Sequence, residues 1–309
     1  MLARVTWAAL TVCAVACGGS EFRSAGTGGS AGSAGAAPGG SGGTVASGGG
    51  SGGSAGVATD GSVSGGAPGG GGATAIPISV VQTSPLVVDS TTDQPKLVLA
   101  KAPSAGNAIL VGISCYSTVD GCTLVPGSVS DDQGNVYARV EEGLSIGGGS
   151  DGVRGYLFIA ENVVVTKSPF TISVNPNGTS SQNEQAVAVG AIEVSGLAPA
   201  PALDQHGKTP APTQTTATSV SSPGPLLQPN ELAVALLSLR SDESPFTINP
   251  DASWTPCHVS QGGQGAPLGH SLVAKVLSST AIVTHTWTHK KPGVGSAAIL
   301  ATFRGQSPD

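Results

Sequence analysis

From residue 76 onwards the chain is made of short runs rich in Val, Ile, Leu and Thr, and Gly, Pro, Asn, Asp and Ser separate these runs. β-Branched residues favour strands and the separating residues favour turns. Runs of this length and spacing are typical of a β-sandwich. The weakest expected strand, 231–239, follows Asn230, which could cap a short helix instead. The pattern as a whole predicts an all-β fold.

The expected strands form two series, separated by a Pro/Thr-rich connection from Pro199 to Pro225. The first series covers residues 96–101, 108–115, 135–140, 155–161, 170–175 and 185–195. The second series covers residues 231–239, 254–257, 270–275, 281–288 and 296–304. Two series of similar composition and length indicate an internal repeat.

Local sequence supports the repeat, because residues 106–111 have a counterpart at 229–234. We therefore expect two pseudo-repeated Greek-key halves, about 76–198 and 226–309, of about four strands each. Neither half has enough alternating apolar positions for a sandwich of its own. The halves are expected to pack face to face as one jelly-roll-like β-sandwich. Two separate small domains are the alternative.

This strand pattern resembles jelly-roll domains of uncharacterised bacterial surface proteins and, more loosely, carbohydrate-binding modules. The resemblance covers residues 76–305 and rests on the pattern of strands. It implies a β-sandwich ectodomain exposed outside the cell.

Residues 17–75 have a different composition, since roughly half of the chain's 47 glycines lie between Gly18 and Gly72. Such a segment has almost no large apolar side chain, so burial cannot offset the entropy lost on ordering. We expect a disordered tether with a root-mean-square length of about 40 Å.

The first 16 residues combine Arg4 with an apolar segment too short to cross a bilayer. The segment Ala14-Val15-Ala16-Cys17 resembles the lipobox of bacterial lipoproteins. This resemblance implies that residues 1–16 are a signal peptide, that Cys17 is lipidated, and that the lipid holds the exported protein at the outer membrane or cell surface. An ordinary signal peptide cut after Ala14 or Ala16 is the alternative.

Cys115 and Cys122 flank a short segment that ends in the turn signal Asp120-Gly121. An exported chain meets an oxidising environment, so we predict a disulfide between them. Such a bond would constrain the unfolded chain by roughly 2–2.5 kcal/mol. Two reduced cysteines are the alternative, and Cys257 is left as a buried or free thiol.

The formal net charge of −6 and the absence of a basic cluster argue against nucleic acid as a partner. No second apolar run is long enough for a transmembrane helix. Asp131, Asp132 and Asn135 offer the oxygen ligands that calcium prefers, but a plain turn explains the same residues. Calcium is thus a candidate cofactor without further support.

Aromatic and histidine residues give the best candidates for ligand binding. His285, Trp287 and His289 share one face of an expected strand, and Trp254 opens a polar loop. The two histidines would be about 13 Å apart, too far to share a metal ion. Indoles of this kind either stack against a sugar or fill a core. An aromatic content of 4% argues against a strong sugar-stacking site.

No nucleophile or carboxylate pair stands out as catalytic. Matches to the Gly-x-Ser-x-Gly pattern lie in glycine-rich stretches without a strand-to-helix context. The sequence therefore predicts a lipid-anchored protein that displays a non-catalytic β-sandwich for binding or structural display, with a glycan or an envelope protein as partner. A carbohydrate-binding module, a polysaccharide-acting hydrolase and a subunit of an envelope assembly are the alternatives.

Overall fold

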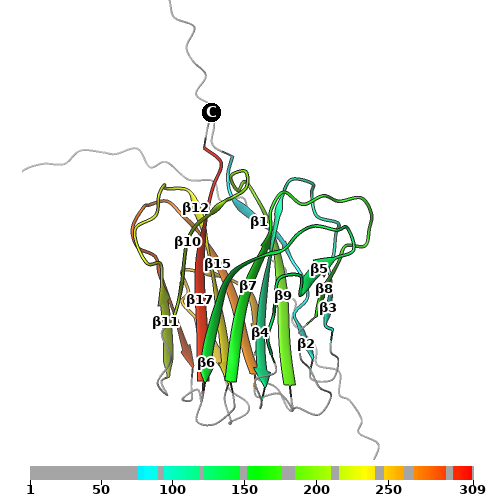
Figure 1. Cartoon of the computed structure of the whole chain (residues 1–309). Helices are drawn as coiled ribbons and strands as arrows, with labels where there is room; N and C mark the ends of the chain where they lie inside the picture. The colour runs from blue at the N-terminus through cyan, green and yellow to red at the C-terminus, as the bar shows by residue number, and fades with distance from the viewer. Residues whose placement is uncertain are drawn as a thin grey trace, which may run out of the picture. The chain divides into compact units, whose positions relative to one another are not determined.

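Residues 76–89, 94–117, 122–146, 152–175, 185–209, 216–240, 247–260, 268–289 and 295–307 are described by the computed structural model. These ranges contain seventeen β-strands and no helix (Figure 1). The expected signal peptide, Cys17 and the tether lie outside the described residues. The predicted all-β sandwich is confirmed, and its jelly-roll assignment stays a prediction.

Two large antiparallel sheets form the centre of the fold. The first large sheet has the order β1(Ser79–Thr83), β9(Gln185–Ser195), β4(Ala108–Ser117), β7(Gly152–Ala160) and β6(Ala138–Ile146), and β2(Val87–Asp89) also pairs with β9. The second large sheet has the order β10(Leu203–Lys208), β17(Gly295–Arg304), β12(Glu231–Arg240), β15(Leu268–Leu277) and β14(Thr255–Ser260).

Each large sheet is accompanied by a small sheet of three strands. The first small sheet has the order β3(Lys96–Val98), β8(Thr171–Val174) and β5(Val129–Asp131). The second small sheet has the order β11(Ala217–Ser221), β16(Thr284–His289) and β13(Ile248–Pro250). In Figure 1 these small sheets lie on opposite sides of the two large ones.

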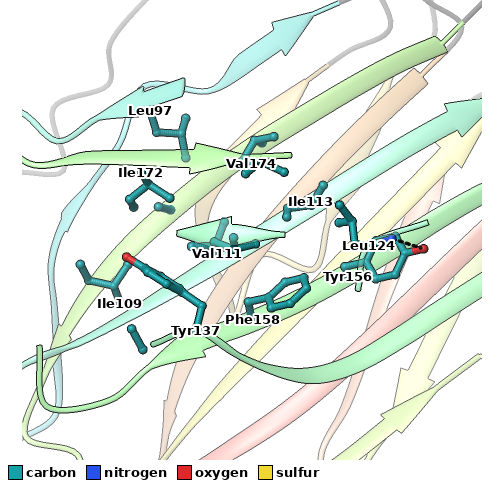
Figure 2. Packing of buried hydrophobic residues seen from close by; sticks show 14 of the residues in the cluster. Leu97, Ile109, Val111, Ile113, Leu124, Tyr137, Tyr156, Phe158, Ile172 and Val174 are labelled. Carbon is teal, nitrogen blue, oxygen red and sulfur yellow. Dashed lines mark hydrogen bonds between the residues drawn. The ribbon is translucent and has the colours of Figure 1, made fainter. Parts of the chain in front are cut away.

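Three apolar layers separate the four sheets. The outer layer of the first half lies between the first small and first large sheets, where Leu97 and Ile172 face Val111, Ile113 and Phe158 (Figure 2). An inner layer lies between the two large sheets and is built from residues such as Leu110, Leu157, Leu236, Leu272 and Ile299. The outer layer of the second half contains Val220, Leu237, Trp287 and Leu300. Strands of the large sheets are thus buried on both faces, which explains their nearly continuous apolar runs.

The two halves have the same strand order. When β2 is left out, each half has eight strands in chain order, and each large sheet reads first, eighth, third, sixth, fifth. Each small sheet reads second, seventh, fourth. The expectation of about four strands per half is therefore wrong, because each half supplies both a large and a small sheet. The second half also begins at β10, within the Pro/Thr-rich segment that was expected to be a connection.

Candidate functional site

The predicted disulfide between Cys115 and Cys122 is present at the end of β4. Both cysteines are buried, and their Cα atoms lie 6.3 Å apart. Cys257 is not part of this bond, and its Sγ lies 3.7 Å from the carbonyl oxygen of Thr255. Both cysteines of the disulfide belong to the outer apolar layer of the first half.

The aromatic candidates lie in the interior rather than on a surface. Trp254 is 4% exposed, and Trp287 and His285 are fully buried. The His285 ring lies 4.6 Å from the Trp254 ring and 4.2 Å from the Trp287 ring, centroid to centroid. The Trp287 indole donates to Ser271 Oγ at 3.0 Å. His289 is also buried, with Nε2 3.3 Å from Thr218 Oγ1.

These four side chains therefore fill the outer layer of the second half, so of the two alternatives for the indoles the structure shows the core-filling one. The physical reason is the alternation of β16, which turns His285, Trp287 and His289 toward the large sheet together. Burial lowers the pKa of His285 to about 4, so its imidazole is neutral at physiological pH.

The candidate calcium ligands form a turn at the end of β5. Asp131 Oδ1 accepts from the backbone N–H groups of Gln133 and Asn135, and Oδ2 accepts from the Asn135 amide and the Tyr137 hydroxyl. Asp132 Oδ1 accepts from the Gln133 side chain at 2.8 Å. Both oxygens of Asp131 are thus engaged inside the turn. In the described part of the chain, no group of three or more His, Cys, Asp or Glu side chains could hold a metal ion.

A polar cluster that the sequence analysis missed lies in the inner layer. Ser238 on β12 donates to Ser114 Oγ on β4 at 2.7 Å, and Ser114 Oγ lies 2.8 Å from His270 Nδ1 on β15. All three side chains are fully buried. The available signal was a serine inside each of two otherwise apolar runs, which marks a buried polar pair.

The two serines occupy equivalent places in the repeat. Val194 and Phe303 each lie next to the last residue of their half's eighth strand, β9 or β17. Val194 pairs with Ala108 of β4, and Phe303 pairs with Leu232 of β12. Six residues further along β4 and β12, this register makes Ser114 equivalent to Ser238. The sequence-based match of 106–111 with 229–234 is therefore wrong by one residue, since it would have made Ser114 equivalent to Leu237. The contact between them therefore lies where the two halves meet each other symmetrically.

His258 on β14 makes a second polar contact between the halves. Its Nε2 lies 2.8 Å from the carbonyl oxygen of Ser84, just after β1. Its ring packs on Gly190 of β9, where an added Cβ would lie 2.6 Å from Nδ1. The His258 and His270 rings are 6.3 Å apart. Burial lowers the pKa of His258, and burial together with His258 lowers that of His270 to about 3.

Glu141 on β6 makes the corresponding contact at the opposite edge. The pairing of β6 with β7 has a bulge just before Glu141, opposite Phe158 and Leu157. The pairing of β14 with β15 has a bulge at the equivalent place, just before His258 and opposite Val273 and Leu272. Each half therefore sends one side chain from its fifth strand to the first strand of the other half, or just beyond it.

Two basic side chains of β10 contact the Glu141 carboxylate. Its oxygens lie 2.8 Å from His206 Nδ1 and 3.3 Å from Lys208 Nζ. Burial raises the pKa of Glu141, but hydrogen bonds from the Glu142 backbone, His206 and Lys208 outweigh it and hold the pKa below its usual value.

Ser114 and His270 are as close as a catalytic nucleophile and its general base, but their environment differs from that of a catalytic pair. A catalytic pair needs access for substrate and a third group that orients the imidazole. Here both side chains are sealed between sheets, and among the described residues His270 Nε2 has no hydrogen-bond partner. We therefore interpret the two serines and two histidines as a joint between the halves, called the inter-half joint below.

No protein-family model, curated protein or solved structure matches this chain. Within the described ranges, no helix is long and apolar enough to cross a membrane.

Proposed function

We propose that this chain is an exported lipoprotein, anchored through Cys17, that displays a non-catalytic β-sandwich at a bacterial outer membrane or cell surface. The lipobox-like segment and the Gly/Ser-rich residues 17–75 supply the anchor and the spacer in this proposal. The display role is binding or structural, with an envelope protein as the favoured partner.

The observation that carries the proposal is the Cys115–Cys122 disulfide. Structural disulfides form and persist in exported proteins and are rare in the cytosol of mesophiles. A chain that folds around such a bond is therefore suited to the compartment that a lipobox implies.

The architecture supports a scaffold rather than an enzyme. The buried polar side chains of the inter-half joint lie between the sheets and connect the two halves; they are Ser114, Ser238, His258 and His270. Both tryptophans in the described part of the chain are buried and offer no indole platform there, so the glycan alternative ranks below a protein partner.

The test of anchoring is the Cys17→Ser variant of the full chain, expressed in a bacterium with its own export machinery. We expect wild type in the membrane fraction and the variant in the soluble exported fraction. Cys257→Ser is the matched control and should stay with the membrane. Membrane association of Cys17→Ser equal to that of wild type would contradict the anchor.

The test of display is cross-linking on whole cells with the anchored protein, followed by identification of the partners. A single stoichiometric envelope protein supports the proposal. Hydrolysis of a polysaccharide by the purified chain would contradict its non-catalytic character.

A further inference from the structure

Two carboxyl groups, the buried one of Glu231 and the half-buried one of Asp204, lie close together in the second half, outside the inter-half joint. Asp204 is on β10 and Glu231 is on β12, with Thr302 of β17 between the two strands. Strand alternation places Glu231 and Thr302 on the face that also carries Ala233 and Leu300, toward the outer layer of the second half. Glu231 is 0% exposed.

Each carboxyl group of this pair has one oxygen that accepts a hydrogen bond and one that accepts none from the described residues. The backbone N–H of Gln228 donates to Glu231 Oε1 at 3.3 Å, and that of Leu227 donates to Asp204 Oδ2 at 3.0 Å. Glu231 Oε2 and Asp204 Oδ1 are both buried and have no donor among the described residues. An unsatisfied buried carboxylate oxygen is costly, and two facing oxygens that are both charged are costlier still.

The equivalent place in the first half is satisfied in another way. The strand register makes Asn107 equivalent to Glu231 and Glu193 equivalent to Thr302. Glu193 is 1% exposed, and its carboxylate accepts from the amides of Gln82 and Asn107 and from the backbone N–H of Ser104. One carboxylate surrounded by amide donors in the first half is thus replaced by two carboxyl groups in the second.

We propose that Asp204 and Glu231 share a single proton. The hydrogen bond that this proton forms holds β10 and residues 226–228 in contact with β12. With the proton present, one carboxyl donates to the other and both leftover oxygens are satisfied. Without it, the buried charge of Glu231 and the half-buried charge of Asp204 repel each other, and the side-chain contact that joins β10 to β12 across β17 loosens. The pair is therefore a pH-sensitive latch at the edge of the second large sheet.

The pKa of Glu231 agrees with this geometry. Burial, followed by the charge of Asp204 and the hydrogen bond with it, raises the pKa to about 7, although a hydrogen bond from Thr302 opposes the rise. A folded-state pKa above the unfolded value means that stability is present at low pH and is lost as the pH rises through about 7.

Other charged groups around the pair are engaged elsewhere. Arg304 of β17 lies opposite Glu231 and donates to the Pro201 carbonyl. Lys275 of β15 donates to Ser253 Oγ, and Glu161 accepts from the backbone N–H of Ala202. On the second small sheet, His285 packs against Trp254 with tilted rings. No described hydrogen bond or ion pair links any of these groups to Asp204 or Glu231.

Thermal unfolding of the full chain between pH 5 and pH 8 tests the latch. Asp204→Asn and Glu231→Gln each supply an amide that can donate to the remaining carboxylate, as Gln82 and Asn107 do for Glu193. Relative to these variants, the Tm of wild type should fall by about 5 °C across this range. Glu193→Gln is the matched control from the first half and should keep the wild-type pH dependence, whatever its effect on stability.

Hydrogen exchange distinguishes a local latch from a general loss of stability. Corrected for intrinsic rates, amides of residues 203–208 and 226–231 should lose protection between pH 6 and pH 8 in wild type but not in Asp204→Asn. Amides of β1 should not change. Equal pH dependence in wild type and both variants would overturn the proposal. So would a rise in the wild-type Tm on adding calcium chloride at pH 8 that Asp204→Asn lacks, because a cation would then occupy the place of the proton.

Discussion

The two halves of this protein have one strand order but different polar interiors. The first half holds the Cys115–Cys122 disulfide and one buried carboxylate, Glu193, with a full set of donors. The second half holds the Asp204–Glu231 pair with two leftover oxygens, and all five histidines lie there. The same backbone frame therefore accepts both a carboxylate with a full set of donors and a carboxyl pair with two oxygens that lack a donor among the described residues. The difference predicts that the pH dependence of folding belongs to the second half.

Acid should produce the largest effect that separates the halves. The pKa values of His270 and His285 are lowered to about 3 and about 4, mainly by burial. A lowered folded-state pKa means that the unfolded chain binds more protons as the pH falls below about 6.5, so stability is lost there. At pH 5 the two histidines together should cost about 4 kcal/mol, from the size of these shifts.

Denaturant unfolding at pH 7 and pH 5 measures this loss. Replacing His285 by Gln should reduce the difference in unfolding free energy between the two pH values by about 2 kcal/mol. Hydrogen exchange at pH 5 should show protection lost first from β15 and β16. Earlier loss from β7 and β8 of the first half would contradict the assignment of acid sensitivity to the second half.

The inter-half joint offers a sharper comparison, because Ser114 and Ser238 are equivalent yet differ in their contacts. Ser114 is bonded to both Ser238 and His270, whereas the place equivalent to His270 in the first half is Gly155, which leaves Ser238 with fewer contacts. Ser114→Ala should cost about 2–3 kcal/mol, since it leaves His270 and Ser238 unsatisfied. Ser238→Ala should cost about 1 kcal/mol.

Chemical denaturation at pH 7, where His270 is neutral, measures both values. Ser271→Ala, on the other face of β15, is a control for the loss of a buried hydroxyl outside the joint, because Ser271 accepts from Trp287. Equal costs at Ser114 and Ser238 would show that His270 does not contribute to the joint.

The disulfide should give the next largest effect, and only through the first half. Cys115→Ser with Cys122→Ser removes a cross-link that closes a short loop, so the free energy of unfolding should fall by about 2 kcal/mol. The pH dependence between pH 5 and pH 8 should stay unchanged. A changed pH dependence would mean that the two halves do not titrate independently.

Sequence reasoning predicted the strands that are buried on both faces, and of the short strands it predicted β3 and β8 but missed others. Long apolar runs such as β4, β12 and β17 carry a strong signal because both of their faces lie against apolar layers. Strands β5 and β13, of three residues each, carry almost none. The expected series of six and five strands therefore fell short of the nine and eight strands found in the two halves.

The polar sites escaped prediction for a related reason. Asp204 and Glu231 are 27 residues apart, and Ser114 and Ser238 are 124 apart. Only the pairing of β10 and β12 with β17, and the stacking of the two large sheets, brings each pair together. Burial of Trp254 and Trp287 was likewise decided by a small sheet whose strands β11 and β13 were not predicted.

The edge contact at Glu141 should have the smallest effect and completes the comparison of the two fifth strands. His206 and Lys208 are about half exposed, and ion pairs with exposed partners contribute about 0.5 kcal/mol. Glu141→Gln should therefore cost about that much at low salt and less in 1 M NaCl, because salt screens exposed charges. Its equivalent, His258, is buried against Gly190, so Gly190→Ala should cost about 1–3 kcal/mol through overpacking and should not respond to salt. Denaturation of both variants at two salt concentrations measures the difference. A salt-independent loss for Glu141→Gln would mean that its hydrogen bonds, rather than its charge, hold β6 against β10.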